Sequence, residues 1–275
     1  MTLAQALAEA AQRGVARLDA QLLLLHALGR SGGDRPWLVA HDADALAPDA
    51  HRAFKLLCEG RVAGEPVAYL VGRKEFFGLD LLVDARVLVP RPDTEVLVEW
   101  ALSVLAGTMA PTVADLGTGS GAIALAIKHA HPDAHVTAID ASPGALAVAR
   151  TNAGRLGLEI DCMAGHWLSS TDQQFTLLVS NPPYVADDDP HLAALGHEPH
   201  MALASGADGL DDIREIVRQS PSHLLPGGWL LLEHGWHQAP AVRTLLAQAG
   251  FVGVGSRRDL AGIERCSGGR WLERG

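Results

Sequence analysis

The sequence predicts an α/β protein in which a doubly wound, mostly parallel sheet follows a small helical domain. After Pro111, short apolar segments that suit strands alternate with amphipathic segments that suit helices, as expected for a parallel sheet covered by helices on both faces. Residues 1–65 instead repeat their apolar positions at helical spacing and contain no strand pattern. A length of 275 residues agrees with one core domain and a smaller partner domain.

The N-terminal domain, residues 1–65, is expected to contain helices over 3–14, 16–30 and 48–61. Glycine ends the first two helices, and Pro48 suits the first turn of the third. This segment carries no chemical motif. It is therefore expected to be a small helical domain that packs or recognises a partner.

Residues 66–90 are expected to form a β-hairpin linker, because "YLVG", "EFFGLDLLVD" and "VLVP" are rich in β-forming residues and are punctuated by glycine. An amphipathic helix over 91–107 then opens the main domain, residues 91–275. Pro92 suits the start of this helix, and the negative charge of Glu95 is favourable near a helix N-terminus.

The main domain is expected to alternate strands and helices. The expected strands cover 112–117, 134–140, 158–165, 175–180 and 227–235, and the expected helices cover 121–131, 143–157, 208–224 and 239–250. Residues 251–260 and 269–275 close the chain. Sheets of this kind bind ligands beyond the carboxyl ends of their strands, so functional residues are expected in the loops that follow the strands.

The composition argues against several classes of function. A formal net charge of −10 disfavours the basic surface that long-range capture of a nucleic-acid backbone needs, although a local basic patch is compatible with it. No apolar run approaches the roughly 20 residues of a membrane span, and no basic leader precedes an apolar stretch at the N-terminus. The three cysteines lie far apart, which argues against a zinc site or a disulfide framework. We expect a cytoplasmic protein that binds neither membranes nor, directly, nucleic acid.

A glycine-rich segment, Asp115-Leu116-Gly117-Thr118-Gly119-Ser120-Gly121, joins the first strand of the main domain to the next helix. Glycines let the backbone turn sharply and approach a ligand closely. The following strand ends at Asp140, 19 residues after Gly121 (140 − 121). An acidic side chain at such a strand tip is placed to accept hydrogen bonds from both ribose hydroxyls.

The glycine spacing favours a nucleoside ligand without a pyrophosphate. The pattern is G-x-G-x-G rather than the G-x-G-x-x-G of dinucleotide sites, and no lysine follows it as in a P-loop. S-adenosylmethionine is such a ligand, and "DLGTGSG" before a helix resembles the loop that binds this methyl donor in Rossmann-like methyltransferases. The alternative is that the segment is a plain glycine turn between strand and helix. Trp167, after the next strand, either stacks on the adenine or belongs to the core. The candidate cofactor-binding residues are Asp115, Gly117, Thr118, Gly119, Ser120, Gly121, Asp140 and Trp167.

The strand over 175–180 ends in Asn181-Pro182-Pro183-Tyr184, at the same expected sheet edge as the glycine loop. Proline fixes its own φ and pushes the preceding residue to extended conformations, so this segment is stiff. The Asn181 side-chain oxygen and the Pro182 carbonyl are each placed to accept one N–H bond from a planar NH2 group. Holding both hydrogens would aim a poorly nucleophilic nitrogen at a sulfonium methyl. The alternative is an ordinary turn at the end of a strand.

The segment Asn181–Tyr184 is similar to the signature of methyltransferases that act on planar amino groups in adenine, guanine or glutamine. Within that class the chain most resembles the release-factor glutamine methyltransferases, from about Val67 to Gly275. The matching stretches are "VLVPRPDTEVLVEWAL", "DLGTGSGAIALA", "VSNPPYVADDDPHL" and "GGWLLLEHGWHQ". The resemblance implies a cytoplasmic enzyme that uses S-adenosylmethionine to methylate the glutamine amide in the Gly-Gly-Gln motif of peptide-chain release factors. It also implies that residues 1–65 recognise this substrate.

The resemblance further implies roles for individual residues. The donor would be held by Gly117 to Gly121 and Asp140, with Trp167 beside its adenine. The glutamine would be held by Asn181, Pro182, Pro183 and Tyr184, and Asn181 would also lie near the donor. The mouth of the pocket would be formed by Arg91 and Glu95. The chain departs from the family pattern at two positions. His166 stands where an acidic residue commonly precedes the tryptophan, and His197 stands where an aromatic residue is expected.

Two other methyl acceptors would suit the segment Asn181–Tyr184, which we call the amide clamp because it is placed to hold a planar NH2 group. One is a glutamine of a ribosomal protein, but the resemblance through "PRPDTE" favours release factors. The other is a base of DNA or RNA, which would predict a target-recognition domain and a basic face. The first 60 residues are not conspicuously basic and the net charge is −10, so nucleic acid is the weaker alternative; salt-sensitive binding would support it. A donor-binding module without catalysis is disfavoured by the intact clamp.

The thirteen histidines do not indicate a metal site. The densest groups are His197-Glu198-x-His200 and His129/His131/His135, and both are interrupted by proline. Neither therefore offers a regular i, i+4 pair of ligands on a helix. We expect an enzyme that uses no metal.

Overall fold

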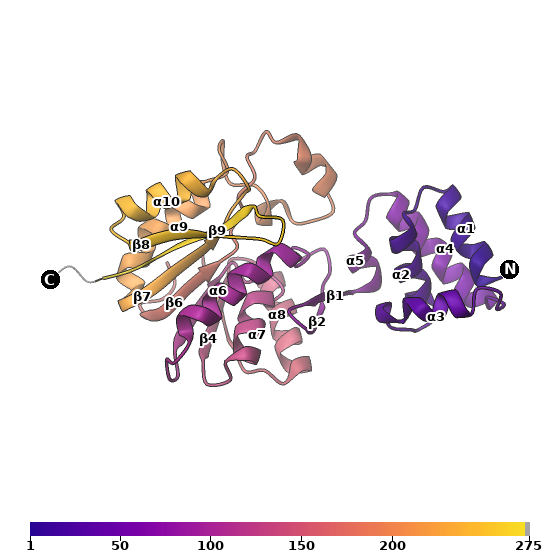
Figure 1. Cartoon of the computed structure of the whole chain (residues 1–275), viewed down its shortest axis with the longest axis horizontal. Coiled ribbons are helices and arrows are strands. Elements are labelled where there is room, and N and C mark those ends of the chain that lie inside the picture. The colour runs from indigo at the N-terminus through magenta and orange to yellow at the C-terminus, as the bar shows by residue number, and fades with distance from the viewer. Residues whose placement is uncertain (273–275) are drawn as a thin grey trace. The chain divides into compact units, whose positions relative to one another are not determined.

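A computed structural model describes residues 1–272 of the chain. These residues form two units, Met1–Arg73 and the part from Lys74 onward, and the last three residues of the expected domain 91–275 lie outside the described range. The first unit is helical and the second contains the sheet (Figure 1). The boundary lies later than the expected one after residue 65, because α5 (Val67–Val71) packs on the core of the first unit.

The first unit is built from helices around one apolar core. They are α1 (Leu3–Gln12), α2 (Arg17–Ala27), α3 (Arg35–Ala40), α4 (Pro48–Val62) and α5, with a 3₁₀ turn, η1 (Gly32–Asp34), before α3. Helix α1 starts at a capping box, in which Thr2 and Gln5 exchange side-chain to backbone bonds of 3.2 and 2.8 Å. Leu23, Leu24 and Leu25 of α2 are fully buried in this core, which accounts for the run of four leucines.

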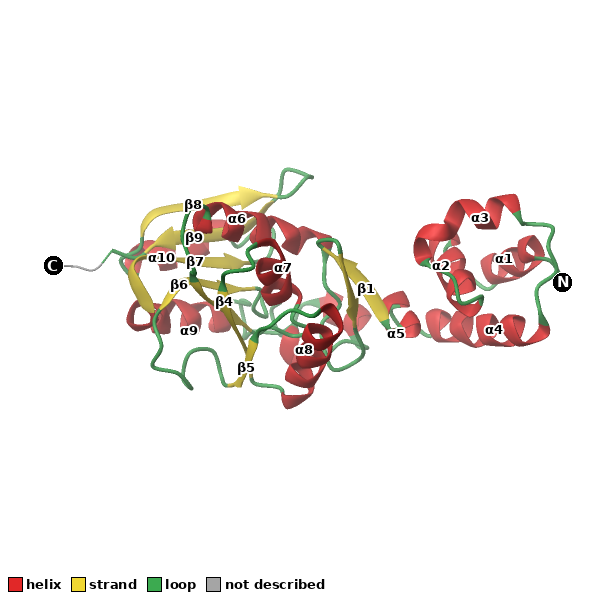
Figure 2. Ribbon diagram, turned by 90° about the horizontal axis from the view of Figure 1, so that it is seen from below, coloured by secondary structure: helices red, strands yellow, loops and turns green. Residues whose placement is uncertain are grey.

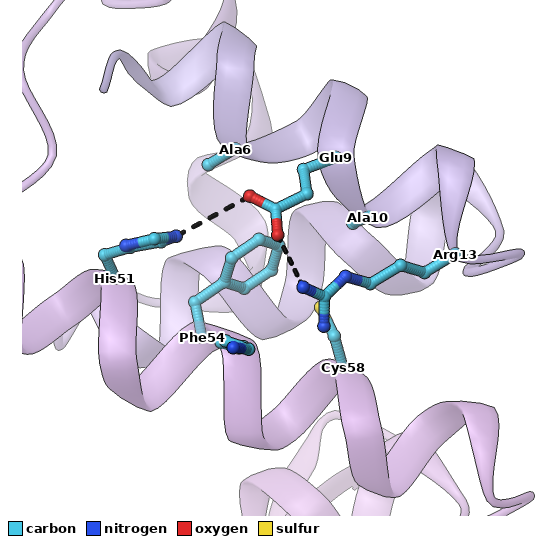
Figure 3. A pocket seen from close by; sticks show the side chains of 8 residues that line it. Ala6, Glu9, Ala10, Arg13, His51, Phe54 and Cys58 are labelled. Atoms are coloured by element: carbon cyan, nitrogen blue, oxygen red, sulfur yellow. Dashed lines mark hydrogen bonds and ion pairs between the residues drawn. The ribbon is translucent and has the colours of Figure 1, made fainter.

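An ion-pair cluster covers the contact between α1 and α4 (Figure 3). The Glu9 carboxylate accepts a bond of 2.6 Å from Arg13 and lies 3.8 Å from Nε2 of His51, above the buried ring of Phe54. Burial raises the pKa of the nearby Cys58 thiol to about 11, so this thiol is unreactive at neutral pH. The hollow beside these side chains has a volume of about 10 Å³, room for about one water molecule. This cluster is structural.

A two-stranded hairpin, β1 (Arg73–Phe76) and β2 (Leu79–Leu82), follows α5. Its turn residues Phe77 and Gly78 have φ of 50° and 78°, the left-handed pair that a tight hairpin turn requires. The expected β-structure on either side of this hairpin is wrong. The "YLVG" segment belongs to α5 and its αL cap, and residues 87–90 form no strand. Short apolar runs do not distinguish a buried helix from a strand.

The second unit contains a seven-stranded sheet of order β5-β4-β3-β6-β7-β9-β8. The strands are β3 (Thr112–Leu116), β4 (His135–Asp140), β5 (Asp161–Ala164), β6 (Phe175–Ser180), β7 (Leu224–Glu233), β8 (Val252–Arg258) and β9 (Glu264–Arg270). The first five in this order are parallel, and β9 runs antiparallel to β7 and β8. Leu116 pairs with Ile139 on one side and with Ser180 on the other, so the loops after β3, β4 and β6 emerge at one edge.

Helices cover both faces of this sheet (Figure 2). They are α6 (Glu95–Leu105), which the 3₁₀ turn η2 (Pro92–Thr94) precedes, α7 (Ala122–Ala130), α8 (Pro143–Leu156), α9 (Asp211–Gln219) and α10 (Ala239–Gln248). Val113 and Leu177 pack in the apolar layer of α6 and α7, whereas Ala114 and Leu178 pack in the layer of α9 and α10. This alternation along the strands confirms the predicted doubly wound α/β fold.

Candidate active site

A cavity of about 500 Å³ lies at the carboxyl ends of β3, β4 and β6. Its wall includes Gly117, Gly119, Asp140, Trp167, Asn181 and Pro183. The sequence predicted functional residues in these loops, and the parallel register of the three strands brings the loops together. This position, outside the strand ends of an open α/β sheet, is the usual one for a ligand.

Asp115, which is buried below the glycine loop, stabilises the conformation of the loop. Oδ2 of Asp115 accepts bonds from the Thr118 hydroxyl at 2.6 Å and from the Ala124 N–H at 3.1 Å. Burial raises the pKa of Asp115 to about 7. Gly117, Gly119 and Gly121 have φ of 72°, 55° and 83°, a region that favours glycine. Gly117 and Gly119 reach the cavity wall, whereas Asp115, Thr118, Ser120 and Gly121 support the loop without lining the cavity.

Asp140 is held in a fixed orientation at the end of β4. One carboxylate oxygen accepts a bond of 2.9 Å from the Gly119 N–H, and the other accepts a bond of 2.8 Å from the Ser142 N–H. Each oxygen keeps further lone pairs that can accept from a ligand. The carboxylate lines the cavity, so it can bind the hydroxyls of a sugar without reorganising.

Trp167 belongs to both the core and the cavity wall. Its side chain packs in the apolar layer of α9 and α10 and also lines the cavity. The indole ring lies so close to Gly117 that a Cβ atom at Gly117 would come within 3.1 Å of Cζ3. The indole N–H donates to Oδ1 of Asp212 at 3.2 Å. Asp212 also lines the cavity, as does His166, so an acidic group is present although residue 166 is not acidic.

The candidate clamp, Asn181–Tyr184, follows β6 directly. Pro182 and Pro183 are buried, and the Asn181 amide donates from Nδ2 to Oγ1 of Thr94 at 3.2 Å. The Tyr184 hydroxyl donates to Oε1 of Glu233 at 3.3 Å, and burial raises the pKa of this tyrosine above its ordinary value. Asn181 and Pro183 line the cavity, which places the clamp and the glycine loop around one space.

Arg91 and Glu95 do not line the cavity. Arg91 forms a short ion pair with Glu198, whose other oxygen accepts the Val89 N–H at 3.0 Å. Glu95 accepts the Phe77 N–H at 3.0 Å. In the structure these two side chains hold neighbouring loops in place.

The sequence indicates Glu233, at the end of a strand beside the site, as a structural residue or a support for Asn181. It does not indicate Thr94, Glu198 or Asp212 as residues that shape the site, although Thr94 lies inside "PRPDTE". Each contacts a residue 45 to 109 positions away in the chain. No local pattern encodes such contacts.

The described residues offer no metal site and no membrane span. Across residues 1–272, no group of three or more His, Cys, Asp or Glu side chains is arranged to hold an ion. None of the helices in the same range combines the length and the apolar character that crossing a bilayer requires.

The fold and the site define a methyltransferase domain. The Methyltransferase small domain family matches residues 94–198. A solved methyltransferase structure from Pyrococcus furiosus shares the fold, with a TM-score of 0.57 at 19% identity over 82% of this chain and 100% of that chain.

Longer matches identify the family. The PrmC N-terminal domain family matches residues 2–72. A release factor glutamine methyltransferase from Bordetella pertussis is 52% identical over 94% of this chain and 96% of its own length. A second, from Xylella fastidiosa, is 49% identical over 96% of this chain and 97% of its own length. The chain belongs to the release factor glutamine methyltransferase family, as the sequence motifs predicted.

Proposed function

We propose that this protein transfers a methyl group from S-adenosylmethionine to the side-chain amide nitrogen, N5, of the glutamine in the Gly-Gly-Gln motif of peptide-chain release factors. The observation that carries the proposal is the position of Asn181 in the wall of the cavity that the glycine loop and Asp140 also line. Curated relatives that match nearly the whole chain are release factor glutamine methyltransferases, which supports the choice of acceptor.

The cavity residues fit S-adenosylmethionine. Asp140 presents acceptor oxygens to ribose hydroxyls, Gly119 leaves room for close backbone approach, and Trp167, which packs against Gly117, offers an aromatic wall. Asp212 adds an acidic group beside this wall. When bound, S-adenosylmethionine supplies an electrophilic methyl group on a sulfonium that departs as a neutral thioether.

Asn181 and Pro182 serve as the catalytic clamp in this proposal. The nitrogen of a glutamine amide is a poor nucleophile, because its lone pair is delocalised into the carbonyl. Oδ1 of Asn181 and the Pro182 carbonyl accept its two N–H groups, which orients the nitrogen and stabilises its developing positive charge. Pro183 lines the cavity beside Asn181, and Tyr184 packs against the layer of α9 and α10 behind it. The proton leaves after methyl transfer, so neither a strong base nor a metal ion is needed.

We also propose that the helical first unit recognises the body of the release factor while the Gly-Gly-Gln segment enters the cavity. The match of residues 2–72 to the PrmC N-terminal domain family supports a separate role for this unit. Three free cysteines and a substrate class that acts in translation favour a cytoplasmic location.

The test is a methylation assay with release factor, ribosomal protein and DNA side by side, followed by peptide mass analysis. We expect a single added methyl group on the Gly-Gly-Gln glutamine of the release factor. Methylation of the ribosomal protein or of DNA, with no methyl group added to the release factor, would contradict the proposal. Asn181→Ala should lower kcat by about 100-fold with little change in donor affinity, whereas the exposed control Gln173→Ala should match the wild type.

A further inference from the structure

We propose that Asp212 and Gln219, on one face of α9, are positioning residues that hold the turn at Trp167 and Leu168 in the conformation that the donor site requires. The inference rests on the proposed function, which assigns Trp167 to the wall of that site. It deepens this function, because it names the residues that keep the wall in place before the donor arrives. Helix α9 starts 44 residues after Trp167 (211 − 167), so the two segments meet only in the folded chain.

Trp167 has a backbone conformation that few bulky residues adopt. Its φ is 54°, in the left-handed region where the Cβ atom of an L-residue is crowded. A residue keeps such a conformation only where the surrounding structure holds it, and residues of this kind cluster at functional sites. Trp167 is 8% exposed, lines the cavity and lies against Gly117. This part of the cavity wall therefore depends on the contacts that its neighbours supply.

The first contact comes from Asp212, the second residue of α9. Its Oδ1 accepts the indole N–H of Trp167 at 3.2 Å. The backbone N–H of Asp212 donates to Oγ of the buried Ser205 at 2.8 Å, so the start of the helix is itself held. A carboxylate in the first turn is also favoured by the helix dipole. Asp212 thus fixes the nitrogen-bearing edge of the indole, while the six-membered ring lies against Gly117.

The second contact comes from Gln219, the last residue of α9. It lies seven residues after Asp212 (219 − 212) and therefore on the same face of the helix. Its Oε1 accepts the backbone N–H of Leu168 at 2.8 Å. Nε2 of the same amide donates to Glu215, whose carboxylate is paired with Arg218. A carboxylate in an ion pair can only accept, so the oxygen of the Gln219 amide must be the atom that faces Leu168.

Helix α9 can act as a fixed support because its apolar side is packed on the sheet. Ile213 and Ile216 are fully buried, in the same apolar layer as Trp167 and Leu168. Polar contacts from both ends of the helix and apolar contacts between them therefore hold the turn before a ligand enters. A wall that is already ordered lowers the entropic cost of binding. If either polar contact is lost, the strained residue can relax and the indole can move away from the glycine loop.

The first experiment measures the affinity of full-length variants for S-adenosylmethionine by calorimetry. Asp212→Ala removes the acceptor of the indole N–H, whereas Asp212→Asn retains an oxygen that can accept it. We expect Asp212→Ala to weaken binding by about tenfold and Asp212→Asn to recover most of the loss. Asp49→Ala is the matched control, because Asp49 is the exposed second residue of α4. Wild-type affinity in Asp212→Ala, or equal losses in both Asp212 variants, would overturn the inference.

A double-mutant cycle shows whether Asp212 acts through the indole. Trp167→Phe keeps an aromatic side chain but removes the N–H group. If Asp212 acts through that group, adding Asp212→Ala to Trp167→Phe should weaken donor binding by about twofold or less. An undiminished loss of about tenfold in the Trp167→Phe background would mean that Asp212 acts on the donor without the indole, and the positioning role would be wrong.

Gln219→Ala tests the second contact by removing the acceptor of the Leu168 N–H. The KM for the donor should rise by about threefold or more, with little change in kcat at saturating donor. Gln248→Ala is the matched control, because Gln248 is the exposed last residue of α10. An unchanged KM for the donor in Gln219→Ala would overturn the assignment of Gln219.

A spectrum of the ligand-free enzyme separates this inference from the proposed function. ¹⁵N-tryptophan labelling gives one indole N–H signal for each of the six tryptophans, and Trp167→Phe identifies the signal of Trp167. This signal should move upfield in Asp212→Ala and stay near its wild-type position in Asp212→Asn, because a hydrogen bond to oxygen deshields the proton. An identical signal in all three proteins would refute the contact. If wild-type enzyme binds the donor but leaves release factor unmethylated, the proposed function fails and the positioning role stands.

Discussion

The indole of Trp167 lies so close to the glycine loop that a Cβ atom at Gly117 would make a tight contact with the ring. A Cβ atom at Gly117 would lie 3.1 Å from Cζ3 of the ring, and Gly117 also has a φ of 72°. The backbone conformation and the contact therefore both favour glycine. Both residues line the cavity, so this contact fixes the shape of the proposed donor site.

Gly117→Ala should weaken donor binding by about tenfold, because the new methyl group strains the backbone and pushes the indole. The matched control is Gly107→Ala, where φ is 79° and no heavy atom counted among residues 1–272 lies within 4 Å of the added Cβ. Both variants carry the backbone strain and should lose similar stability. Calorimetric donor affinity should fall only in Gly117→Ala; an equal loss in both would show that the contact with Trp167 is irrelevant.

Asp140→Asn should weaken donor binding by about tenfold or more. The new NH2 group would face the N–H of either Gly119 or Ser142, both of which now donate to the carboxylate. The effect should appear in the donor affinity and in KM for the donor, with a smaller change in kcat at saturation. Asp172→Asn, an exposed control, should bind the donor normally. Unchanged donor affinity in Asp140→Asn would remove Asp140 from the site.

The stability of the ligand-free protein should fall as pH rises from about 4 to about 7. Burial raises the pKa of Asp115 from 3.8 to about 7, so the folded protein holds this proton more tightly than the unfolded chain. The stabilisation is complete below the unfolded pKa and is lost as pH rises through 7. Glu233 contributes in the same direction. Chemical denaturation at several pH values should show this decline, and Asp115→Asn should reduce its slope; an identical slope would contradict the assignment.

The ion pair between Arg91 and Glu198 should stabilise the loop that carries Glu198. The Glu198 side chain is 3% exposed and Arg91 is 39% exposed, so Arg91→Ala leaves a buried carboxylate that keeps its bond from the Val89 N–H but loses its cation. We expect a loss of about 1–2 kcal/mol, less than for a fully buried pair because Arg91 is partly solvated. The double variant Arg91→Ala/Glu198→Gln should be more stable than Arg91→Ala alone. Additive losses in a double-mutant cycle would show that the pair is not coupled.

Removal of the first unit, Met1–Arg73, tests its proposed role in recognition. KM for whole release factor should rise much more than KM for a short Gly-Gly-Gln peptide, because only the whole factor can contact the missing helices. Donor affinity serves as the control for correct folding of the remaining chain. Equal changes in both KM values would argue against a recognition role.

Local sequence patterns were sufficient for the five parallel strands of the sheet, its covering helices and the two motifs at its edge. Alternating segments gave the parallel strands, and the motif "DLGTGSG", Asp140 and Asn181–Tyr184 each follow a strand directly. Parallel strands put such loops at one edge whatever the details of packing, so both motifs meet at one cavity. The error over "YLVG" arose where a short apolar run fits helix and strand equally well.

The sequence by itself determined the class of fold and the presence of the glycine loop and of the Asn181–Tyr184 segment after their strands, because each depends on residues close together in the chain. Only the tertiary structure decided how these parts are supported. The bonds from Asn181 to Thr94, from Tyr184 to Glu233 and from Trp167 to Asp212 span 87, 49 and 45 residues. Such contacts depend on which strands become neighbours and on how each side chain packs, and neither periodicity nor motif spacing carries that information.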